Sequence, residues 1–411
     1  MLAEVLLGRK IRIGTLHLVY PSGKRRIFGS GAPEAEWIIH RKSSLQRVAR
    51  SPGLALGETY MEGLWEAGKG GMLPLLEVLM RNFPEPNVGG LRRALSVLSK
   101  TFLQWNPPTR SRRNVAHHYD LDEWLFRHFL DRELHYSCAY FAGEGVDLET
   151  AQQTKCRHIA TKLRLSPGQR VLDIGCGWGG MALYLAQQAQ VRVVGLTLSE
   201  EQLAVARRRA AALGLEQLVE FRLQDYREHQ GRYDRIVSIG MFEHVGLPHF
   251  RTYFRQIREL LTDDGVALLH TIGSFIPSQG TNPWIRRYIF PGGYIPPLSE
   301  ICAPVEECGL LTADVEVLRL HYAVTLGHWR SRFLRNRAVI AQHLDEHFCR
   351  MWEFYLAVCE AAFRWRNLAV FQLQLCKAVD TLPLTRDYMY LPAEQRPEQR
   401  AASTPARAMR H

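Results

Sequence analysis

Several features that define whole classes of protein are missing from this chain of 411 residues. No apolar run approaches the roughly 20 residues that a membrane-spanning helix requires. The first ten residues, MLAEVLLGRK, are apolar only briefly and carry Glu4 without a basic leader, so we do not expect a signal peptide. A cytoplasmic protein of ordinary globular composition is therefore expected.

Paired cysteines and internal repeats are missing as well. The eight cysteines form no Cys-x-x-Cys pair and are scattered along a long chain, which argues against a zinc site and against a disulfide framework. We therefore expect no metal. We find no internal repeat, and no RNA-reading motif is present, so we expect no nucleic-acid partner.

Positive charge, in contrast, is in excess. The formal net charge is +11, and residues 1–50 contain ten basic but only three acidic side chains. A basic surface attracts polyanions. The composition alone does not choose between nucleic acid, an anionic lipid surface and a plain solvated face.

The order of patterns predicts two domains. A small α+β domain is expected at 1–105, with a β-rich stretch near 11–20, a mixed apolar and basic element at 37–48 and a helix at 72–82. The Pro-Pro pair and the arginines of 106–113 are typical of a linker, because proline interrupts regular structure. We expect a catalytic domain at 114–391 and a disordered tail at 392–411, which is polar and rich in proline and alanine.

Strands and helices should alternate in the second domain. Strands are expected at 170–174, 191–196, 218–223, 233–239, 265–272 and 315–320, and helices at 121–132, 148–164, about 178–190, 200–213 and 247–261. This order predicts an α/β fold with a Rossmann-like parallel sheet and helices on both faces. The stretch 274–312, rich in proline and glycine, is predicted to form a lid, and the apolar spacing of 344–376 predicts helix.

The strongest local signal is VLDIGCGWGG at 171–180, where a strand should end in a glycine-rich turn before a helix. Glycines let the backbone approach a ligand closely, and ligands of such sheets bind beyond the carboxyl ends of the strands. Gly175 and Gly177 follow a Gly-x-Gly-x-Gly pattern, and the carboxylate of Asp173 suits a cationic amino-acid tail better than a pyrophosphate. The loop therefore indicates S-adenosylmethionine (SAM), as in class I methyltransferases. Thr197 or Gln202 would bind the ribose, and Asp225 and Tyr226 are candidates for the adenine.

Further motifs gather at the predicted strand ends. They are HYDL at 118–121, HYSCAYF at 135–141, DYR at 225–227, GMFEHVG at 240–246, HTIG at 270–273 and HY at 321–322. Together with the glycine loop, Trp284 and the YIFP stretch at 288–291, they resemble the cyclopropane-fatty-acyl-phospholipid synthase family, in its order, across about 115–380. The N-terminal segment also resembles the extra domain of the bacterial synthases.

The resemblance implies that the methyl carbon of SAM is transferred to the cis double bond of an unsaturated phospholipid acyl chain, which then closes a cyclopropane ring. Ring closure needs a base that removes a proton from the added carbon. In this family the base is similar to a bound bicarbonate ion. By motif position its holders would be Cys138, Glu243, His270, Ile272 and Tyr322, with Ile272 and Cys138 acting through backbone groups.

The same resemblance implies a set of cofactor contacts. They are Tyr119, Tyr136, Ser137, Gly175, Gly177, Thr197, Leu198, Gln202 and Ile239. Cys359 occupies a position where the family has been suspected to carry a nucleophile, so it stays among the catalytic candidates. Its place on an apolar helical stripe, with no base beside it in sequence, favours core packing instead.

Plain structural roles remain open for several candidates. Cys138 and Tyr322 could be packing residues, Glu243 could cap the following helix, and His270 could be a satisfied core histidine. At the level of function, the alternatives are a related methyltransferase that leaves a methyl branch or methylates a small amine, and a noncatalytic, nucleic-acid-binding protein that uses the basic charge.

Substrate and partner expectations follow from the same patterns. The lid at 274–312 and the apolar stretch at 344–376 would form the acyl-chain pocket. The basic N-terminal domain, with Arg110, Arg112 and Arg113, would face phosphate headgroups and hold the protein peripherally on the inner face of an anionic membrane. A homodimer is a further expectation from similar proteins.

Overall fold

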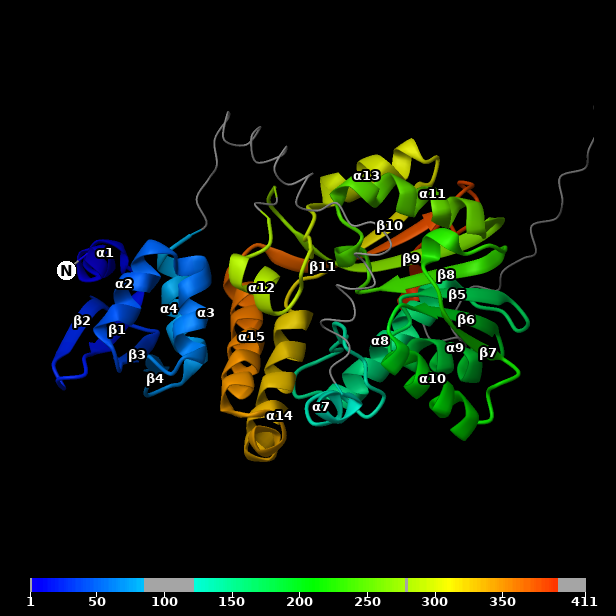
Figure 1. Cartoon of the computed structure of the whole chain (residues 1–411). Helices are drawn as coiled ribbons and strands as arrows, with labels where there is room; N and C mark the ends of the chain where they lie inside the picture. Colours follow the sequence, from blue (N-terminus) through cyan, green and yellow to red (C-terminus); the bar gives the residue numbers. More distant parts are fainter. Residues whose placement is uncertain (1, 85–121, 278–279, 391–411) are drawn as a thin grey trace, which may run out of the picture.

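The structure is a computed structural model that describes residues 2–84, 122–277 and 280–390. The predicted linker at 106–113, the candidate Tyr119 and the predicted tail at 392–411 lie outside the described residues. What is described forms two units, each with its own sheet (Figure 1).

The first unit is the small α+β domain that the sequence predicts. Its elements are α1 (Leu2–Lys10), β1 (Gly14–Val19), β2 (Arg25–Ser30), β3 (Glu34–Ile39), α2 (Lys42–Arg50), α3 (Pro52–Met61), β4 (Trp65–Ala67) and α4 (Met72–Asn82). The four strands lie in the order β2-β1-β3-β4, with β1 and β3 parallel. The mixed element expected at 37–48 is the end of β3 followed by α2.

The second unit is a class I methyltransferase sheet of seven strands in the order β10-β11-β9-β8-β5-β6-β7. Its strands are β5 (Arg170–Ile174), β6 (Arg192–Thr197), β7 (Val219–Leu223), β8 (Tyr233–Ile239), β9 (Leu261–Ser274), β10 (Leu311–Leu318) and β11 (Leu368–Cys376). Strands β5 to β9 are parallel where they pair, so their carboxyl ends meet at one edge. That edge is where ligands bind in such sheets.

Helices cover both faces of this sheet, as expected (Figure 1). They are α8 (Leu148–Leu163), α9 (Gly180–Ala189), α10 (Glu200–Ala212), α11 (Phe250–Leu260) and α13 (Leu298–Glu307). The short α7 (Glu123–Arg127) contacts α10, and the terminal α16 (Asp387–Tyr390) contacts α8. Three short turns, η1 (Tyr226–Glu228), η2 (Phe242–His244) and η3 (Leu247–His249), complete the unit's connections at this edge. Capping side chains fix several starts: Asp147 accepts a hydrogen bond from the Thr150 N–H at the start of α8, and Ser199 from the Gln202 N–H at α10. The helix predicted at 121–132 is much shorter, since α7 spans five residues.

Two predictions about this unit are wrong. The sheet is not wholly parallel, because β11 pairs antiparallel with both β9 and β10. The stretch 344–376 is not helical throughout: helix α15 (Glu346–Trp365) ends before β11. The β11 sequence LAVFQLQLC is almost uniformly buried, including Gln372 and Gln374. Its strand signal, the alternation of these two glutamines with apolar residues, covers only a few positions directly after a long helical stripe.

The predicted lid is more ordered than a loop. It contains α12 (Pro283–Tyr288) and α13, and α12 lies against α3 of the first unit. Helix α14 (His321–Leu344), which the sequence patterns did not predict, is joined to α15 by the single residue Asp345 and packs along it. Within the described residues, no helix is both long and apolar enough to cross a bilayer.

The two units share one hydrophobic core. Helices α3 and α4 of the first unit pack on α15 of the second, which lies between that unit and the large sheet (Figure 1). One continuous cluster of buried side chains extends from Leu16 and Trp65 in the first unit to Trp352 and Phe354 in α15. The small domain therefore packs against the second unit through α15 and shares its core.

Candidate functional site

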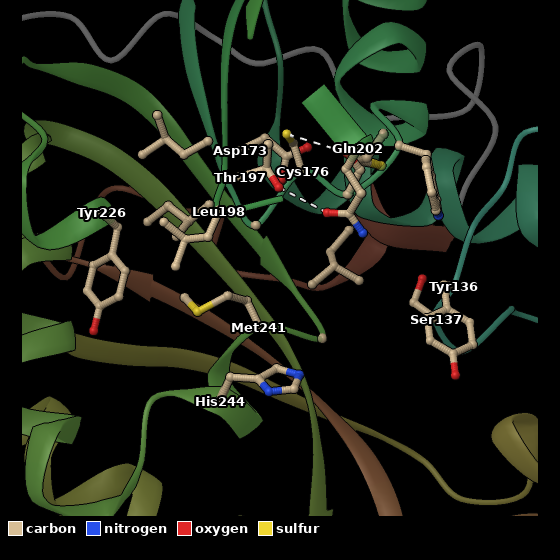
Figure 2. Close-up of a pocket in the computed structure, with 18 of the residues that line it drawn as sticks. Tyr136, Ser137, Asp173, Cys176, Thr197, Leu198, Gln202, Tyr226, Met241 and His244 are labelled. Carbon is tan, nitrogen blue, oxygen red and sulfur yellow. Dashed lines mark hydrogen bonds between the residues drawn. The ribbon is translucent and has the colours of Figure 1, made fainter. Parts of the chain in front are cut away.

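A cavity lies at the carboxyl ends of β5, β6 and β8, and we call it the loop cavity because the glycine loop forms one wall (Figure 2). Every described cofactor candidate lines it: Tyr136, Ser137, Asp173, Gly175, Gly177, Thr197, Leu198, Gln202, Asp225, Tyr226 and Ile239. These residues come from five separate segments of the sequence, 136–137, 173–177, 197–202, 225–226 and 239, so their convergence depends on the sheet topology.

The glycine loop leaves room for a ligand. Gly175 has a φ of +84°, and a Cβ there would lie 2.8 Å from the Met241 side chain. Gly177 has a φ of +51°, and a Cβ there would meet only open space. Both positions require the left-handed backbone that glycine adopts without strain. Asp173, at the end of β5, is buried with Oδ2 unpartnered, and burial raises the pKa of its carboxyl to about 7.

The second strand presents polar groups in place of an acidic residue. The Thr197 hydroxyl donates to Gln202 Oε1 at 2.9 Å, which turns the amide nitrogen of Gln202 away from Thr197 (Figure 2). Asp225 is held differently, because both of its carboxylate oxygens accept hydrogen bonds from the Arg227 guanidinium. Tyr226 lies across the cavity from Tyr136 and Ser137 (Figure 2).

A larger cavity of about 740 Å³ adjoins the first, and we call it the apolar cavity. All six catalytic candidates line it: Cys138, Glu243, His270, Ile272, Tyr322 and Cys359. Its other walls are mostly apolar side chains of the small domain and α15, among them Leu7, Leu45, Leu56, Leu76, Phe354 and Val358. Tyr136, Ser137, Gly240 and His244 line both cavities and so mark their junction.

Glu243 is held against the neighbouring strand. Its Oε1 accepts a hydrogen bond from the Ile272 N–H at 2.6 Å, while its buried Oε2 has no partner. The carboxylate therefore does not cap the helix that follows, which was the plain alternative. Burial raises the pKa of Glu243 to about 7, so it can exchange a proton near neutral pH.

The pairing of three strands fixes the position of His270. It lies opposite Ile239 on β8 and opposite Gln372 on β11. Burial lowers the pKa of His270 to about 3, so its ring is neutral at physiological pH. The ring is buried in the core and also borders the apolar cavity.

The two cysteines and Tyr322 border the same space. Burial raises the pKa of the Cys138 thiol, and that of Cys359 to about 12, so both thiols are protonated at neutral pH. The Cys138 thiol donates to the carbonyl of Ala139 at 3.3 Å. Burial also raises the pKa of Tyr322, which keeps its hydroxyl as a hydrogen-bond donor.

Sequence reasoning assigned no role to several residues that line the loop cavity. It left His244 undecided and gave no role to Lys155, Met241 or Arg227, all of which line this cavity. Burial lowers the pKa of His244 to about 4. Met241 and His244 flank Glu243 in the GMFEHVG motif, so that motif carried a signal for them. Lys155 had none, since a lysine in a helix is usually solvated.

Comparison with known proteins agrees with this geometry. A family model described as mycolic acid cyclopropane synthetase matches residues 107–373. The chain is 38% identical over 351 residues to cyclopropane-fatty-acyl-phospholipid synthase of Escherichia coli, covering 85% of this chain and 90% of that protein. It is 37% identical over 396 residues to tuberculostearic acid methyltransferase of Mycobacterium tuberculosis, covering 92% and 91%.

A solved structure gives the same result at the level of the fold. The structure of the cyclopropane synthase MmaA2 from Mycobacterium tuberculosis matches with a TM-score of 0.62 at 32% identity, over 66% of this chain and 99% of that one. The match in sequence and in fold points to one conclusion. This chain belongs to the mycolic acid cyclopropane synthetase family of SAM-dependent methyltransferases.

Proposed function

We propose that this protein transfers a methylene carbon from SAM to the cis double bond of an unsaturated phospholipid acyl chain and closes a cyclopropane ring. The observation that carries the proposal is the junction of the two cavities. The cofactor candidates line one cavity and the catalytic candidates line an apolar one, with Tyr136, Ser137, Gly240 and His244 shared between them. A volume of about 740 Å³ lies within the range of roughly 300–1,000 Å³ that pockets for small organic ligands span.

The residues around the loop cavity fit the cofactor. An unpartnered buried carboxylate at Asp173 suits the ammonium of the methionine tail, and the open space at Gly177 admits a ligand. When bound, SAM supplies an electrophilic methyl group to an alkene, which is a weak nucleophile. The apolar walls exclude water and position the chain, and positioning supplies much of the rate in such reactions.

Three of the catalytic candidates that line the apolar cavity also fit a bicarbonate ion. Glu243 Oε2 is buried and unpartnered, and His270 and Tyr322 border the same cavity as hydrogen-bond donors. A bicarbonate held by these three side chains and by the backbone at Cys138 would supply a small base. Ile272 would act indirectly, because its N–H donates to Glu243 Oε1 and so orients the carboxylate.

The test is an incubation of the full-length protein with labelled SAM and liposomes of unsaturated phospholipid, followed by analysis of the fatty-acid esters. The proposal predicts a mass gain of one CH2 per chain together with loss of the double bond. Depletion of dissolved carbon dioxide should lower the rate, and added bicarbonate should restore it. Retained unsaturation after methyl transfer would contradict ring closure.

A second candidate is methylation of the acyl chain without ring closure. The relative named tuberculostearic acid methyltransferase supports it, because its match spans 92% of this chain at 37% identity, close to the 38% of the synthase. A saturated methyl-branched ester in the same assay would identify that reaction. A small-molecule amine is disfavoured by the size and apolar lining of the larger cavity.

We also propose that the small domain rests on an anionic membrane surface. Arg9, Lys10, Lys24, Arg41 and Lys42 are exposed on this unit. Each basic residue near such a surface contributes about 1 kcal/mol, and salt screens the attraction. Flotation with anionic vesicles at low and high salt tests this, and failure to float at low salt would contradict it. Sedimentation equilibrium tests the expected homodimer.

A further inference from the structure

Helix α8 carries two buried lysines in contrasting surroundings. Lys155 and Lys162 are seven residues apart, and both are 0% exposed. Lys162 has an ionic partner, because its ammonium contacts the carboxylate of Glu316. Lys155 has no carboxylate within 4.0 Å in the described ranges, and its ammonium donates to the Ser137 hydroxyl at 3.0 Å.

A buried ammonium with only a neutral partner is costly. Removing an unpaired charge from water is strongly unfavourable even after the protein relaxes. A single serine hydroxyl recovers only a small part of that cost. The position of Lys155 is therefore explained best if an anion enters beside it.

The same cavity contains the opposite charge, also without a partner. Asp173 is 1% exposed, and its Oδ2 accepts no hydrogen bond. Lys155 and Asp173 both line the loop cavity, yet they do not form an ion pair with each other. A cavity with one unmatched cation and one unmatched anion is complementary to a zwitterion.

We propose that Lys155 binds the carboxylate of the methionine tail of SAM, opposite the ammonium that Asp173 binds. Lys155 then adds a cofactor contact that the family motifs did not indicate. Ser137, which the Lys155 ammonium already contacts, lies next to the bound carboxylate. This inference rests on the proposed function only in its use of SAM, and it holds for a ring or a branched product alike.

The tail carboxylate is favoured over an anion at the reaction site by position. Lys155 lines the loop cavity, whereas the six catalytic candidates line the apolar cavity, whose walls do not include Lys155. Gln152, one helical turn earlier on α8, donates to the carbonyls of His135 and Ser137, so α8 holds the loop that carries the tail contacts.

The test measures binding rather than turnover. Isothermal titration of the full-length protein compares three ligands: S-adenosylhomocysteine, its decarboxylated analogue, and 5′-methylthioadenosine, which lacks the whole tail. Lys155→Met should weaken S-adenosylhomocysteine about 10- to 100-fold, since a charge-assisted hydrogen bond is lost. The affinities for the other two ligands should change by less than about threefold, because neither carries a carboxylate.

Lys162→Met is the matched control, on the same helix and equally buried. It should change the affinities for all three ligands by the same factor. Asp173→Asn should weaken the two ligands that carry the amine and spare 5′-methylthioadenosine. Melting curves verify that each variant is folded. If Lys155→Met does not fold, the wild-type protein still decides: it should bind S-adenosylhomocysteine at least tenfold more tightly than the decarboxylated analogue.

Two results would overturn the inference: an equal loss of affinity for all three ligands in Lys155→Met, and an unchanged affinity for S-adenosylhomocysteine. If the unchanged affinity came with a raised bicarbonate requirement for turnover, Lys155 would be assigned to the reaction-site anion. Failure of the proposed function looks different, because the wild-type protein would then bind none of the three ligands or would leave the acyl chains unchanged.

Discussion

Gln372 determines which ring nitrogen of His270 carries the proton. The Gln372 Oε1 accepts a hydrogen bond from the Lys162 ammonium at 2.8 Å, and an ammonium can only donate. The amide nitrogen of Gln372 therefore faces His270 Nδ1, at 3.1 Å, and must donate to it. In the neutral ring the proton then resides on Nε2, where His270 can donate to an anion in the apolar cavity.

Replacing Gln372 with glutamate should reverse this tautomer. The new carboxylate keeps an acceptor for Lys162 but offers only acceptors to the ring, so the proton moves to Nδ1 and Nε2 becomes an acceptor. We expect a loss of turnover of roughly 10-fold or more, the equivalent of one charge-assisted hydrogen bond. Nitrogen-15 NMR of the imidazole reports the tautomer directly. Gln374→Glu is the control, because Gln374 is buried on the same strand face but contacts the Lys162 carbonyl and not His270.

The raised pKa of Glu243 predicts a pH dependence of stability. The carboxyl has an ordinary pKa of 4.5 and a folded-state pKa of about 7, so the folded protein binds the proton more tightly. This contribution to stability is complete below 4.5 and is lost as the pH rises through 7. Relative to Glu243→Gln, the free energy of unfolding should fall by about 3 kcal/mol between about pH 4 and pH 8. Denaturant titrations at several pH values measure it, and parallel curves would contradict the assignment.

Turnover of Glu243→Gln provides a second reading of the same residue. The amide oxygen can still accept from the Ile272 N–H, but the group no longer ionises. We expect a rate loss of about 100-fold or more with nearly unchanged affinity for S-adenosylhomocysteine, because Glu243 lines the apolar cavity and not the loop cavity. Full activity in this variant would refute a role in proton transfer.

Cys359 should prove dispensable as a nucleophile. Burial raises the pKa of its thiol to about 12, so a negligible fraction is thiolate at neutral pH. Cys359→Ala should therefore retain turnover within about threefold, the change expected from a small cavity at a packing position. Tyr322→Phe, which changes another residue of the same wall, should lose more. A thousandfold loss of turnover in Cys359→Ala would contradict this prediction and support a role for Cys359 as a nucleophile.

Side chains of the small domain that line the apolar cavity should limit the length of the acyl chain that it accepts. Leu56 on α3 lines the cavity, whereas Leu54 on the same helix packs against the core outside it. Leu56→Trp should raise KM for long-chain phospholipids several-fold and leave short-chain substrates nearly unaffected. Leu54→Trp should change both alike. Equal KM changes for long and short chains in Leu56→Trp would place the acyl chain elsewhere.

Local sequence patterns were sufficient to predict the glycine loop, which is built from one strand and one turn. The loop around Asp173 and Gly175 was readable because glycine and a strand-end carboxylate act within a few residues of each other. The parallel strands β5 to β9 were equally readable, since α9, α10 and α11 separate most of them along the chain and only the short turn η1 lies between β7 and β8. Family resemblance then supplied Glu243, His270 and Tyr322, which no local pattern brings together.

Only the tertiary structure decided how those parts meet. The antiparallel insertion of β11 places Gln372 beside His270, 102 residues away in sequence, and no local pattern specifies which strand a buried glutamine will lie against. It also decided that Lys155 faces a cofactor cavity, where its sequence context predicts a solvated helix surface. Burial shifts the pKa values of titratable side chains. It results from long-range packing, which a local sequence pattern does not contain.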